Sequence, residues 1–328
     1  MKIDIFAHYL PTKYAEALGK KVAGGEARWF KENPALSQID IRLRIMDMSS
    51  DVVQVLNVAT PPLETLVSAK EAIDLARIAN DEMAEVVARY PNKFLSAMAC
   101  LPLNDIDAAI KEADRAITQL HFAGIQIFTN INGEPLDTPK FRPLFERMSQ
   151  HDLPIIIHPW LHPKSSAGNL LTNPVGPLGW PFETTVAMGC LAQSGVFEDY
   201  PNIKFITHHC GGMVPYFARR IAMPSWWMTV NANGEKRTRV AANFHKFYGD
   251  TALYGNTAAL MCGYAYFGAD HILFGTDMPL GGGEDCGGGF LCTQDTIQSI
   301  EQMDISPLDK ENIFENNARR VMRLQPTK

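Results

Sequence analysis

Four short apolar runs in this sequence each end in a side chain that can bind a metal ion or transfer a proton. These residues are His8, His158, His209 and Asp277, at the ends of residues 3–8, 154–158, 203–209 and 272–277. An ionisable group at the end of an apolar strand is costly to bury unless it has a partner. Imidazole nitrogens and a carboxylate are suitable ligands for Zn²⁺ or a similar divalent ion. One such histidine alone is most often structural, but four on separate strands predict a metal or acid/base site.

Eight apolar runs alternate with amphipathic helical patterns along the whole chain. The strands and helices that they predict must position the four ionisable residues. The runs cover residues 3–8, 52–58, 94–103, 124–129, 154–158, 203–209, 247–251 and 272–277. The helical patterns cover residues 68–89, 105–119, 141–150, 182–194, 213–222, 256–267, 293–303 and 307–322. The runs are apolar on both faces, which is typical of buried parallel strands. Asp105 stands where the N-cap of the second helix is expected.

About eight strand–helix units predict an α/β fold, a single (β/α)₈ TIM barrel in which residues 1–328 form one domain. A doubly wound open sheet is the alternative, but no G-x-G-x-x-G motif follows the first strand. Active sites of such barrels lie at the C-terminal ends of the strands, where the four ionisable residues fall. Irregular composition predicts loop insertions near residues 19–44, 161–179, 225–240 and 280–289.

His208 stands next to His209 at the end of the sixth predicted strand. Neighbouring residues on a strand point to opposite faces, so only one of these imidazoles is expected to enter the mouth of the barrel. The spacing of the sequence alone does not decide which one it is.

The composition excludes several classes of protein. With 46% hydrophobic residues and ordinary glycine and proline content, the chain is neither disordered nor fibrous. A net charge of −6 provides no basic surplus for a nucleic-acid partner. No apolar stretch reaches the ~18 residues that a membrane span needs. Six cysteines without a C-x-x-C pair, and an N-terminus unlike a signal peptide, predict reduced thiols in a cytoplasmic protein.

Four segments in order resemble the amidohydrolase-related decarboxylases, typified by aminocarboxymuconate semialdehyde decarboxylase and γ-resorcylate decarboxylase. The opening segment is IDIFAHYLP at residues 3–11, and the last is FGTDMP at residues 274–279. Between them, residues 155–221 carry IIIHPW, GWPFETT and GVFEDYPNIKFITHHCGGMVPYFARRI. Each motif alone is moderately specific, whereas all four in order are a strong signal that covers most of the chain.

The resemblance implies a role for each of the four residues. His8, His158 and Asp277 match metal ligands of the family. His209 matches its acid/base histidine, because it precedes Pro215 by the family's spacing, and Asp277 is also expected to protonate the carbon that loses CO₂. The implied cofactor is a divalent metal ion, with Zn²⁺ preferred and Mn²⁺ as the alternative.

Phe6 departs from the family pattern, which has histidine or, in some decarboxylases, glutamate at that position. A phenylalanine cannot bind a metal. Three protein ligands and water still make a reasonable catalytic zinc site, but Phe6 predicts weaker binding or its loss.

The resemblance implies non-oxidative decarboxylation of a small unsaturated or aromatic carboxylic acid. Hydrolysis of a lactone, amide or ester, with or without a metal, is the second hypothesis, and a ligand-binding barrel without activity is the third. A homodimer is expected from the family. Candidate arginines for the substrate carboxylate, among which the sequence does not choose, are Arg28, Arg42, Arg44, Arg219, Arg237 and Arg239.

Overall fold

Eight parallel strands form one sheet in the order β1-β2-β3-β4-β7-β8-β9-β10. The computed structural model describes residues 1–21, 33–58, 61–165, 176–221, 240–280 and 289–325. The eight strands are β1 (Lys2–Tyr9), β2 (Val52–Val58), β3 (Phe94–Ala99), β4 (Gly124–Phe128), β7 (Ile155–His158), β8 (Phe205–Thr207), β9 (Tyr248–Asp250) and β10 (Ile272–Leu273). A short antiparallel pair, β5 (Asn130–Ile131) and β6 (Glu134–Pro135), follows β4. The predicted barrel of parallel strands is therefore confirmed.

Hydrogen bonds between β1 and the segment after β10 bring the two edges of the sheet together. The backbone N–H of Ile5 donates to the carbonyl of Phe274 at 3.0 Å, and that of His8 donates to Met278 at 2.7 Å. The Asp4 carboxylate accepts from the backbone N–H of Thr276 at 3.0 Å and from its hydroxyl at 2.6 Å. These contacts place the end of the last strand beside the first one, about 270 residues away in the sequence.

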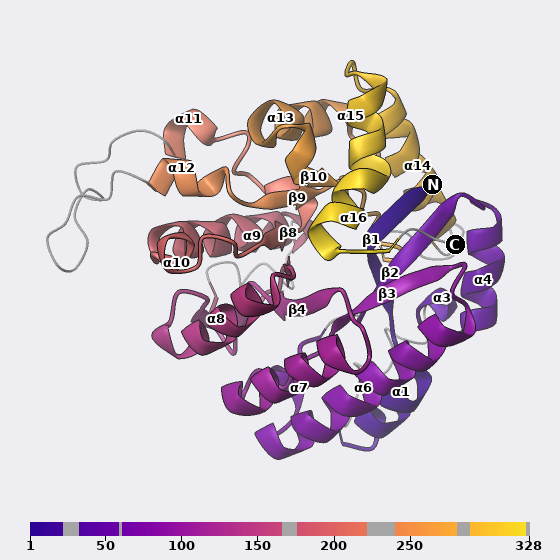
Figure 1. The fold of residues 1–328 in the computed structure, drawn as a ribbon, viewed down its shortest axis with the longest axis vertical. Helices are drawn as coiled ribbons and strands as arrows, with labels where there is room; N and C mark the ends of the chain where they lie inside the picture. Colours follow the sequence, from indigo (N-terminus) through magenta and orange to yellow (C-terminus); the bar gives the residue numbers. More distant parts are fainter. Residues whose placement is uncertain (22–32, 59–60, 166–175, 222–239, 281–288, 326–328) are drawn as a thin grey trace, which may run out of the picture.

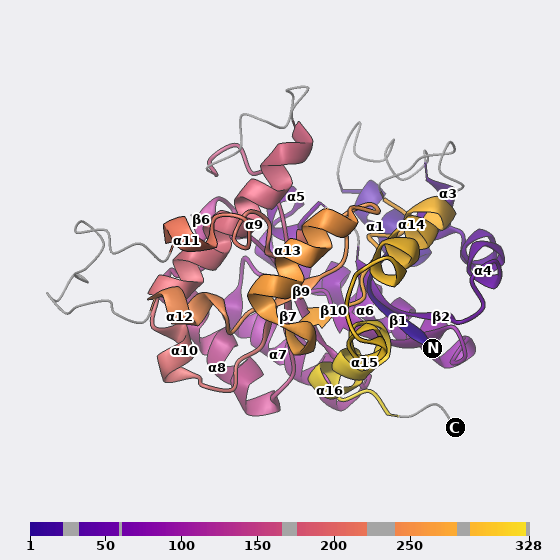
Figure 2. The same cartoon turned by 90° about the horizontal axis from the view of Figure 1, so that it is seen from above.

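Helices lie around the outside of the strands (Figures 1 and 2). Along the first part of the chain they are α1 (Thr12–Gly19), α3 (Pro34–Ser37), α4 (Ile39–Asp47), α5 (Leu63–Leu66), α6 (Ala69–Arg89), α7 (Ile106–Thr118) and α8 (Arg142–His151). The later ones are α9 (Gly176–Gln193), α10 (Val196–Asp199), α11 (Ala218–Ile221), α12 (Val240–Phe244), α13 (Thr257–Phe267), α14 (Phe290–Glu301), α15 (Pro307–Glu311) and α16 (Asn317–Met322). Short 3₁₀ turns are η1 (Pro139–Phe141), η3 (His209–Gly211) and η4 (Ala269–His271), and a π-helical turn, η6 (Asn312–Asn316), joins α15 to α16.

Local sequence signals explain where the long helices begin. Ser68 and Glu71 form a capping box at the start of α6, which satisfies backbone donors that the first turn leaves free. The Asp105 carboxylate accepts a hydrogen bond from the backbone N–H of Ala108 at 3.0 Å, so the predicted N-cap of α7 is confirmed.

The strands are apolar on both faces because each face packs in a different hydrophobic layer. One layer lies inside the barrel and includes Ile5, Val55, Ile156 and Ile206, while the other lies between strands and helices. Ile155 and Ile157 belong to the outer layer, so β7 alternates between the layers as a strand should.

Several predicted elements are shorter than expected. The run at residues 94–103 is a strand only to Ala99, and those ending at 209 and 277 leave the sheet after Thr207 and Leu273. A left-handed backbone conformation at His209 turns the chain soon after Thr207, and another at Asp277 marks the end of the second run. The helical pattern at 213–222 is helical only at α11 within the described residues.

The predicted insertions coincide mainly with residues that the structure does not describe. Residues 22–32, 166–175, 222–239 and 281–288 lie outside the described residues. The described part of the first insertion contains α3 and most of α4, which sequence patterning did not predict. Among the described residues, no helix combines the length and apolar character needed to cross a bilayer.

Candidate active site

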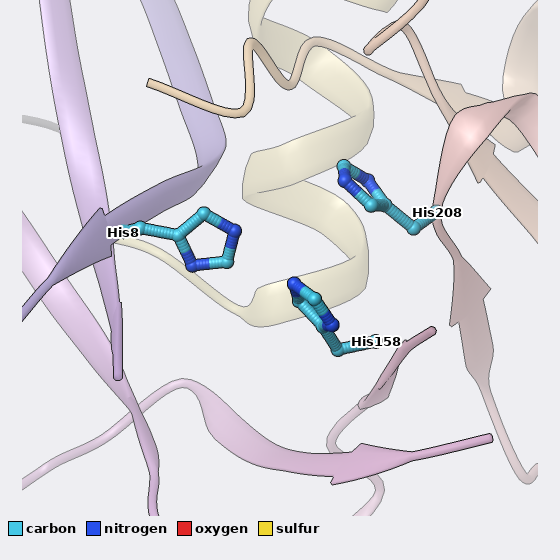
Figure 3. Close-up of side chains that lie close together, drawn as sticks. All are labelled: His8, His158 and His208. Carbon is cyan, nitrogen blue, oxygen red and sulfur yellow. The ribbon is translucent and has the colours of Figure 1, made fainter. Parts of the chain in front are cut away.

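Three histidine side chains converge at the C-terminal ends of three strands. His8 projects from β1, His158 ends β7, and His208 directly follows β8 (Figure 3). One ring nitrogen from each lies within 4.8 Å of those of the other two. All three residues are buried, with exposed fractions of 0%, 6% and 1%. The arrangement brings three imidazole rings together in a space shielded from water.

Strand periodicity explains why these three rings face the interior. Ile156 and Ile206 pack inside the barrel, so two residues further along His158 and His208 point the same way. In β1 the pairing register with β2 shifts between Asp4 and Ala7. This irregularity changes the phase of β1, because Ile5 and its neighbour Phe6 both pack inside.

Asp277 brings a carboxylate to the same point. Its backbone N–H donates to the carbonyl of Phe6 at 3.0 Å, which places its side chain beside β1. Its Oδ1 lies 2.9 Å from Nε2 of His8 and 3.4 Å from Nε2 of His208. Burial raises the pKa of Asp277, but the charge of His208 outweighs it and holds this pKa well below its ordinary value.

The glycine of the FGTD segment permits this approach. A Cβ atom at Gly275 would lie 3.0 Å from Cβ of Phe6 and 3.1 Å from Cβ of Asp250. Both distances are shorter than an ordinary carbon–carbon contact. A side chain at residue 275 would force Phe6 or Asp250 to shift, so glycine favours the close passage of this segment between β1 and β9.

His208 is held by contacts on several sides. Its Nδ1 hydrogen-bonds to Oδ2 of Asp250, a carboxylate with no exposed surface. The Phe6 ring stacks on the imidazole, with ring centroids 3.8 Å apart and planes 7° from parallel. Burial lowers the pKa of His208, but Asp250 and Asp277 raise it overall, to about 10.

His209 also faces the site, contrary to the expectation that only one of the adjacent histidines would do so. A ring nitrogen of His209 lies within 4.8 Å of ligand atoms of His208 and Asp277. Its φ of 54° turns the chain after β8, so the alternation of an extended strand no longer applies. Within the part of the chain that the structure describes, the buried Nδ1 of His209 has no hydrogen-bond partner. Burial, and then the charge of His208, holds its pKa well below the ordinary value.

Four residues of the site or its rim have left-handed backbone conformations that are uncommon for residues other than glycine. They are His209, Cys210, Tyr254 and Asp277, with φ of 54°, 52°, 49° and 64°. Such conformations cost free energy of order 1 kcal/mol or more and concentrate at functional sites. Their grouping at one end of neighbouring strands supports a functional role for this region.

The donor set fits a divalent metal ion. Among the described residues, Nδ1 of the fully buried His8 has no hydrogen-bond partner and Nε2 faces the Asp277 carboxylate at 2.9 Å, so an ion would satisfy one of these nitrogens. Nδ1 of His158 is hydrogen-bonded to the carbonyl of Pro159 at 2.7 Å, which leaves Nε2 free to bind. Imidazoles and a carboxylate suit zinc, manganese and similar ions.

The sequence did not indicate the roles of Asp250 and Tyr254. Asp250 ends a weak strand and fixes His208, while Tyr254 lies in the loop that follows and donates its hydroxyl hydrogen bond to Oδ2 of Asp277. The Tyr254 side chain is 45% exposed, so it connects the buried carboxylate with the outside of the site. Asp250 is the carboxylate of a strand end and could have been found by the same rule as Asp277.

Arg42 supports the site from behind and is not available to a substrate in this structure. Its guanidinium has no exposed surface, donates to the carbonyl of His8 at 2.6 Å and donates to Oε1 of Gln54 at 2.9 Å. Arg44 and Arg219 are exposed. Three further candidate arginines, Arg28, Arg237 and Arg239, lie outside the described residues.

Comparison with known proteins places these features in a family. Residues 3–324 match the family described as Amidohydrolase. The chain is 29% identical to 2-amino-3-carboxymuconate-6-semialdehyde decarboxylase of Dictyostelium discoideum, over 100% of this chain and 93% of that protein. It is 31% identical to γ-resorcylate decarboxylase of Rhizobium radiobacter, over 87% of each.

A solved structure shows the same architecture. A dihydroxybenzoic acid decarboxylase from a Polaromonas species, with bound manganese and the inhibitor 2-nitroresorcinol, aligns with a TM-score of 0.81 and 26% identity. The alignment covers 99% of this chain and 98% of that one.

Proposed function

This protein belongs to the amidohydrolase family, and from that premise we propose that it is a metal-dependent, non-oxidative decarboxylase of a small aromatic carboxylic acid. The observation that carries the proposal is the convergence of His8, His158 and Asp277 with two further histidines at the C-terminal face of the barrel. Both curated relatives described above are decarboxylases, which favours loss of CO₂ over the hydrolytic alternative.

The proposed substrate is an aromatic acid that carries hydroxyl groups near the carboxylate. The γ-resorcylate and dihydroxybenzoic acid decarboxylases support this class, since their names specify such substrates. 2-Nitroresorcinol, the inhibitor bound to the Polaromonas enzyme, has the same pattern of substituents. A muconate semialdehyde is the alternative substrate class.

In the proposed site, His8, His158 and Asp277 bind the divalent ion. When bound, such an ion supplies a positive charge that orients the oxygen atoms of the substrate and stabilises negative charge developing on it. Zinc is the metal we favour because nitrogen donors outnumber oxygen donors. Manganese, which is bound in the Polaromonas relative, is the alternative.

The reaction breaks the bond between the ring carbon and the carboxyl carbon. CO₂ leaves, the electron pair of that bond stays on the ring carbon, and a proton must be delivered to it. We assign the delivery to Asp277, whose carboxylate is ionised in the free site and takes up the proton that a substrate hydroxyl group releases on binding. The proton that restores this hydroxyl group after CO₂ has left comes from solvent, and we assign its movement to His209. A low pKa keeps His209 neutral near pH 7, so that it can accept a proton before it returns one.

Tyr254 is placed to connect the Asp277 carboxylate with solvent for proton exchange. Its hydroxyl donates a hydrogen bond to that carboxylate, and its ring is partly exposed. The left-handed backbone conformation of Asp277 directs its carboxylate towards both Tyr254 and His8. A buried acid without such a connection would exchange protons slowly after each turnover.

The test combines metal analysis with an assay for CO₂. Purified protein is analysed for zinc and manganese, and 2,6-dihydroxybenzoate is supplied while CO₂ and the resorcinol product are measured. We expect near one ion per chain and release of one CO₂ per product. Asp277→Asn should lose turnover and weaken metal binding, whereas His209→Ala should lose turnover and keep the metal.

Two outcomes would contradict the proposal. If a panel of hydroxybenzoates and muconates gives no CO₂ while lactones are opened, the activity is hydrolytic. If His209→Ala retains most of the turnover, His209 has no part in proton movement.

A cytoplasmic homodimer remains part of the proposal. The absence of disulfides among the described cysteines is compatible with a reducing compartment. Light scattering of the eluted protein, expected at twice the 36.4 kDa chain mass, tests the dimer.

A further inference from the structure

We propose that His208 is a fourth protein ligand of the metal ion, so that the site consists of three imidazoles and one carboxylate. The other three ligands are His8, His158 and Asp277. This inference rests on the proposed metal dependence, but it is independent of which substrate the enzyme decarboxylates.

The position of His208 is central among the candidate ligands. A nitrogen of His208 lies within 4.8 Å of nitrogens of both His8 and His158. The three side chains converge from different strands in Figure 3. A ligand atom of His208 also lies within 4.8 Å of ligand atoms of His209 and Asp277. Its Nε2 lies 3.4 Å from Oδ1 of Asp277. His208 is therefore common to both clusters of possible ligands, the one with His8 and His158 and the one with His209 and Asp277.

The hydrogen bond to Asp250 orients His208 for metal binding. A ligating histidine commonly has its second ring nitrogen hydrogen-bonded to a carboxylate, which fixes the ring and makes it a better donor. Nδ1 of His208 has this partner, so Nε2 is the nitrogen directed at the site. The carboxylate is itself fixed, because its Oδ1 accepts from the backbone N–H of Cys210 at 3.2 Å and of Ala252 at 3.1 Å.

Phe6 completes the support for this ring. Its side chain has no metal-binding atom, is fully buried and stacks face to face with His208. The same ring lies 5.2 Å from the His8 ring and 5.6 Å from the His158 ring, measured between centroids. Phe6 thus forms the apolar wall against which the three imidazoles are arranged, and β8 rather than position 6 of β1 supplies the additional ligand.

His209 is the competing candidate, and the structure separates the two. Ligand atoms of His209 cluster within 4.8 Å with those of His208 and Asp277, but not in the cluster that His8 and His158 form with His208. No carboxylate among the described residues hydrogen-bonds to its buried Nδ1 to orient the ring. We therefore assign metal binding to His208 and leave His209 to proton movement.

The first experiment measures metal affinity rather than activity. The protein is freed of metal with a chelator, and Zn²⁺ binding is measured by competition with a chromophoric indicator. We expect His208→Ala to raise the Zn²⁺ dissociation constant by more than about 100-fold and Asp250→Asn by roughly 10–100-fold, the range typical of outer partners. The matched control, His209→Ala, should bind Zn²⁺ within about threefold of the unchanged protein.

The second experiment needs no substitution at His208. X-ray absorption of the zinc-loaded, unchanged protein counts imidazole ligands, and we expect three. His209→Ala should also show three.

The outcomes distinguish the two proposals. Two imidazoles in the unchanged protein, or native Zn²⁺ affinity in folded His208→Ala, would overturn the role of His208 and leave the proposed function intact. Loss of one imidazole in His209→Ala would assign the ligand to His209 instead. Failure of the unchanged protein to bind any divalent ion would overturn both this inference and the metal dependence on which it rests.

Discussion

Replacing Phe6 by alanine should destabilise the metal-free protein by about 4 kcal/mol. Removing a fully buried phenylalanine side chain generally costs about 3–5 kcal/mol, and the cost is larger where the surroundings cannot collapse into the space. Two neighbours are tied elsewhere, since His158 is hydrogen-bonded to Pro159 and His208 to Asp250. Of that total, about 0.5–1.5 kcal/mol comes from the stacking of the Phe6 ring on His208.

The assay is thermal or urea unfolding in the presence of a chelator. For 328 residues the entropy of unfolding near 60 °C is about 0.7 kcal/mol/K, so a loss of 4 kcal/mol lowers Tm by about 6 °C. Phe6→Leu is the matched control. It keeps an apolar side chain of nearly similar volume and should cost only about 1.5 kcal/mol.

The same variants test the support that Phe6 gives to His208. Phe6→Ala should weaken Zn²⁺ binding by about tenfold, because the imidazole loses the surface that holds its plane, whereas Phe6→Leu should have a smaller effect. A loss of stability below about 1 kcal/mol in Phe6→Ala would refute the packing argument. Native Zn²⁺ affinity in that variant would refute the positioning argument.

Three other perturbations test the surroundings of the site. Arg42→Leu leaves the carbonyl of His8 and the amide oxygen of Gln54 without their donor, and should destabilise the protein by about 3 kcal/mol in urea unfolding; unchanged stability with a raised KM would instead make Arg42 a substrate-binding residue. Tyr254→Phe should lower kcat by about tenfold and flatten the pH–rate profile with the metal content unchanged, and a native kcat would remove Tyr254 from the proton path. Burial raises the pKa of Glu64 to about 8, so the folded state keeps a proton that the unfolded chain releases near pH 4.5, and stability falls as the pH rises between these values. Glu64→Gln should remove much of this decline between pH 5 and pH 8, whereas an unchanged slope would show that Glu64 does not cause it.

The architecture follows from local patterns that persist in the folded protein. The run at residues 52–58 is β2 without change, because a short, valine-rich and mainly apolar run is identified as a strand without tertiary information. Ser68, Glu71 and Asp105 mark helix starts by satisfying backbone donors within a few residues. The two short helices before β2, α3 and α4, were not predicted. With four and nine residues, they are too short to show a clear helical periodicity of apolar residues.

The site could be predicted only as far as strand ends reveal it. His8, His158 and Asp277 stand out because a polar residue interrupts an apolar run. The sequence predicted that only one of His208 and His209 would face the site, because the left-handed turn at His209 that admits both has no signal in the sequence. Tyr254 has no signal in the sequence, because its role arises from a loop that approaches Asp277.

The amino-acid sequence by itself determined which chemical groups are available and that they follow parallel strands in a barrel. Tertiary structure alone decided which of them meet. The contact of Asp4 with Thr276 depends on closing the sheet between its two ends. The shift of register in β1 and the left-handed turn at His209 also appear only in the folded chain. Distances at the site are therefore set by long-range packing, since local preferences specify a strand but not the partner at its end.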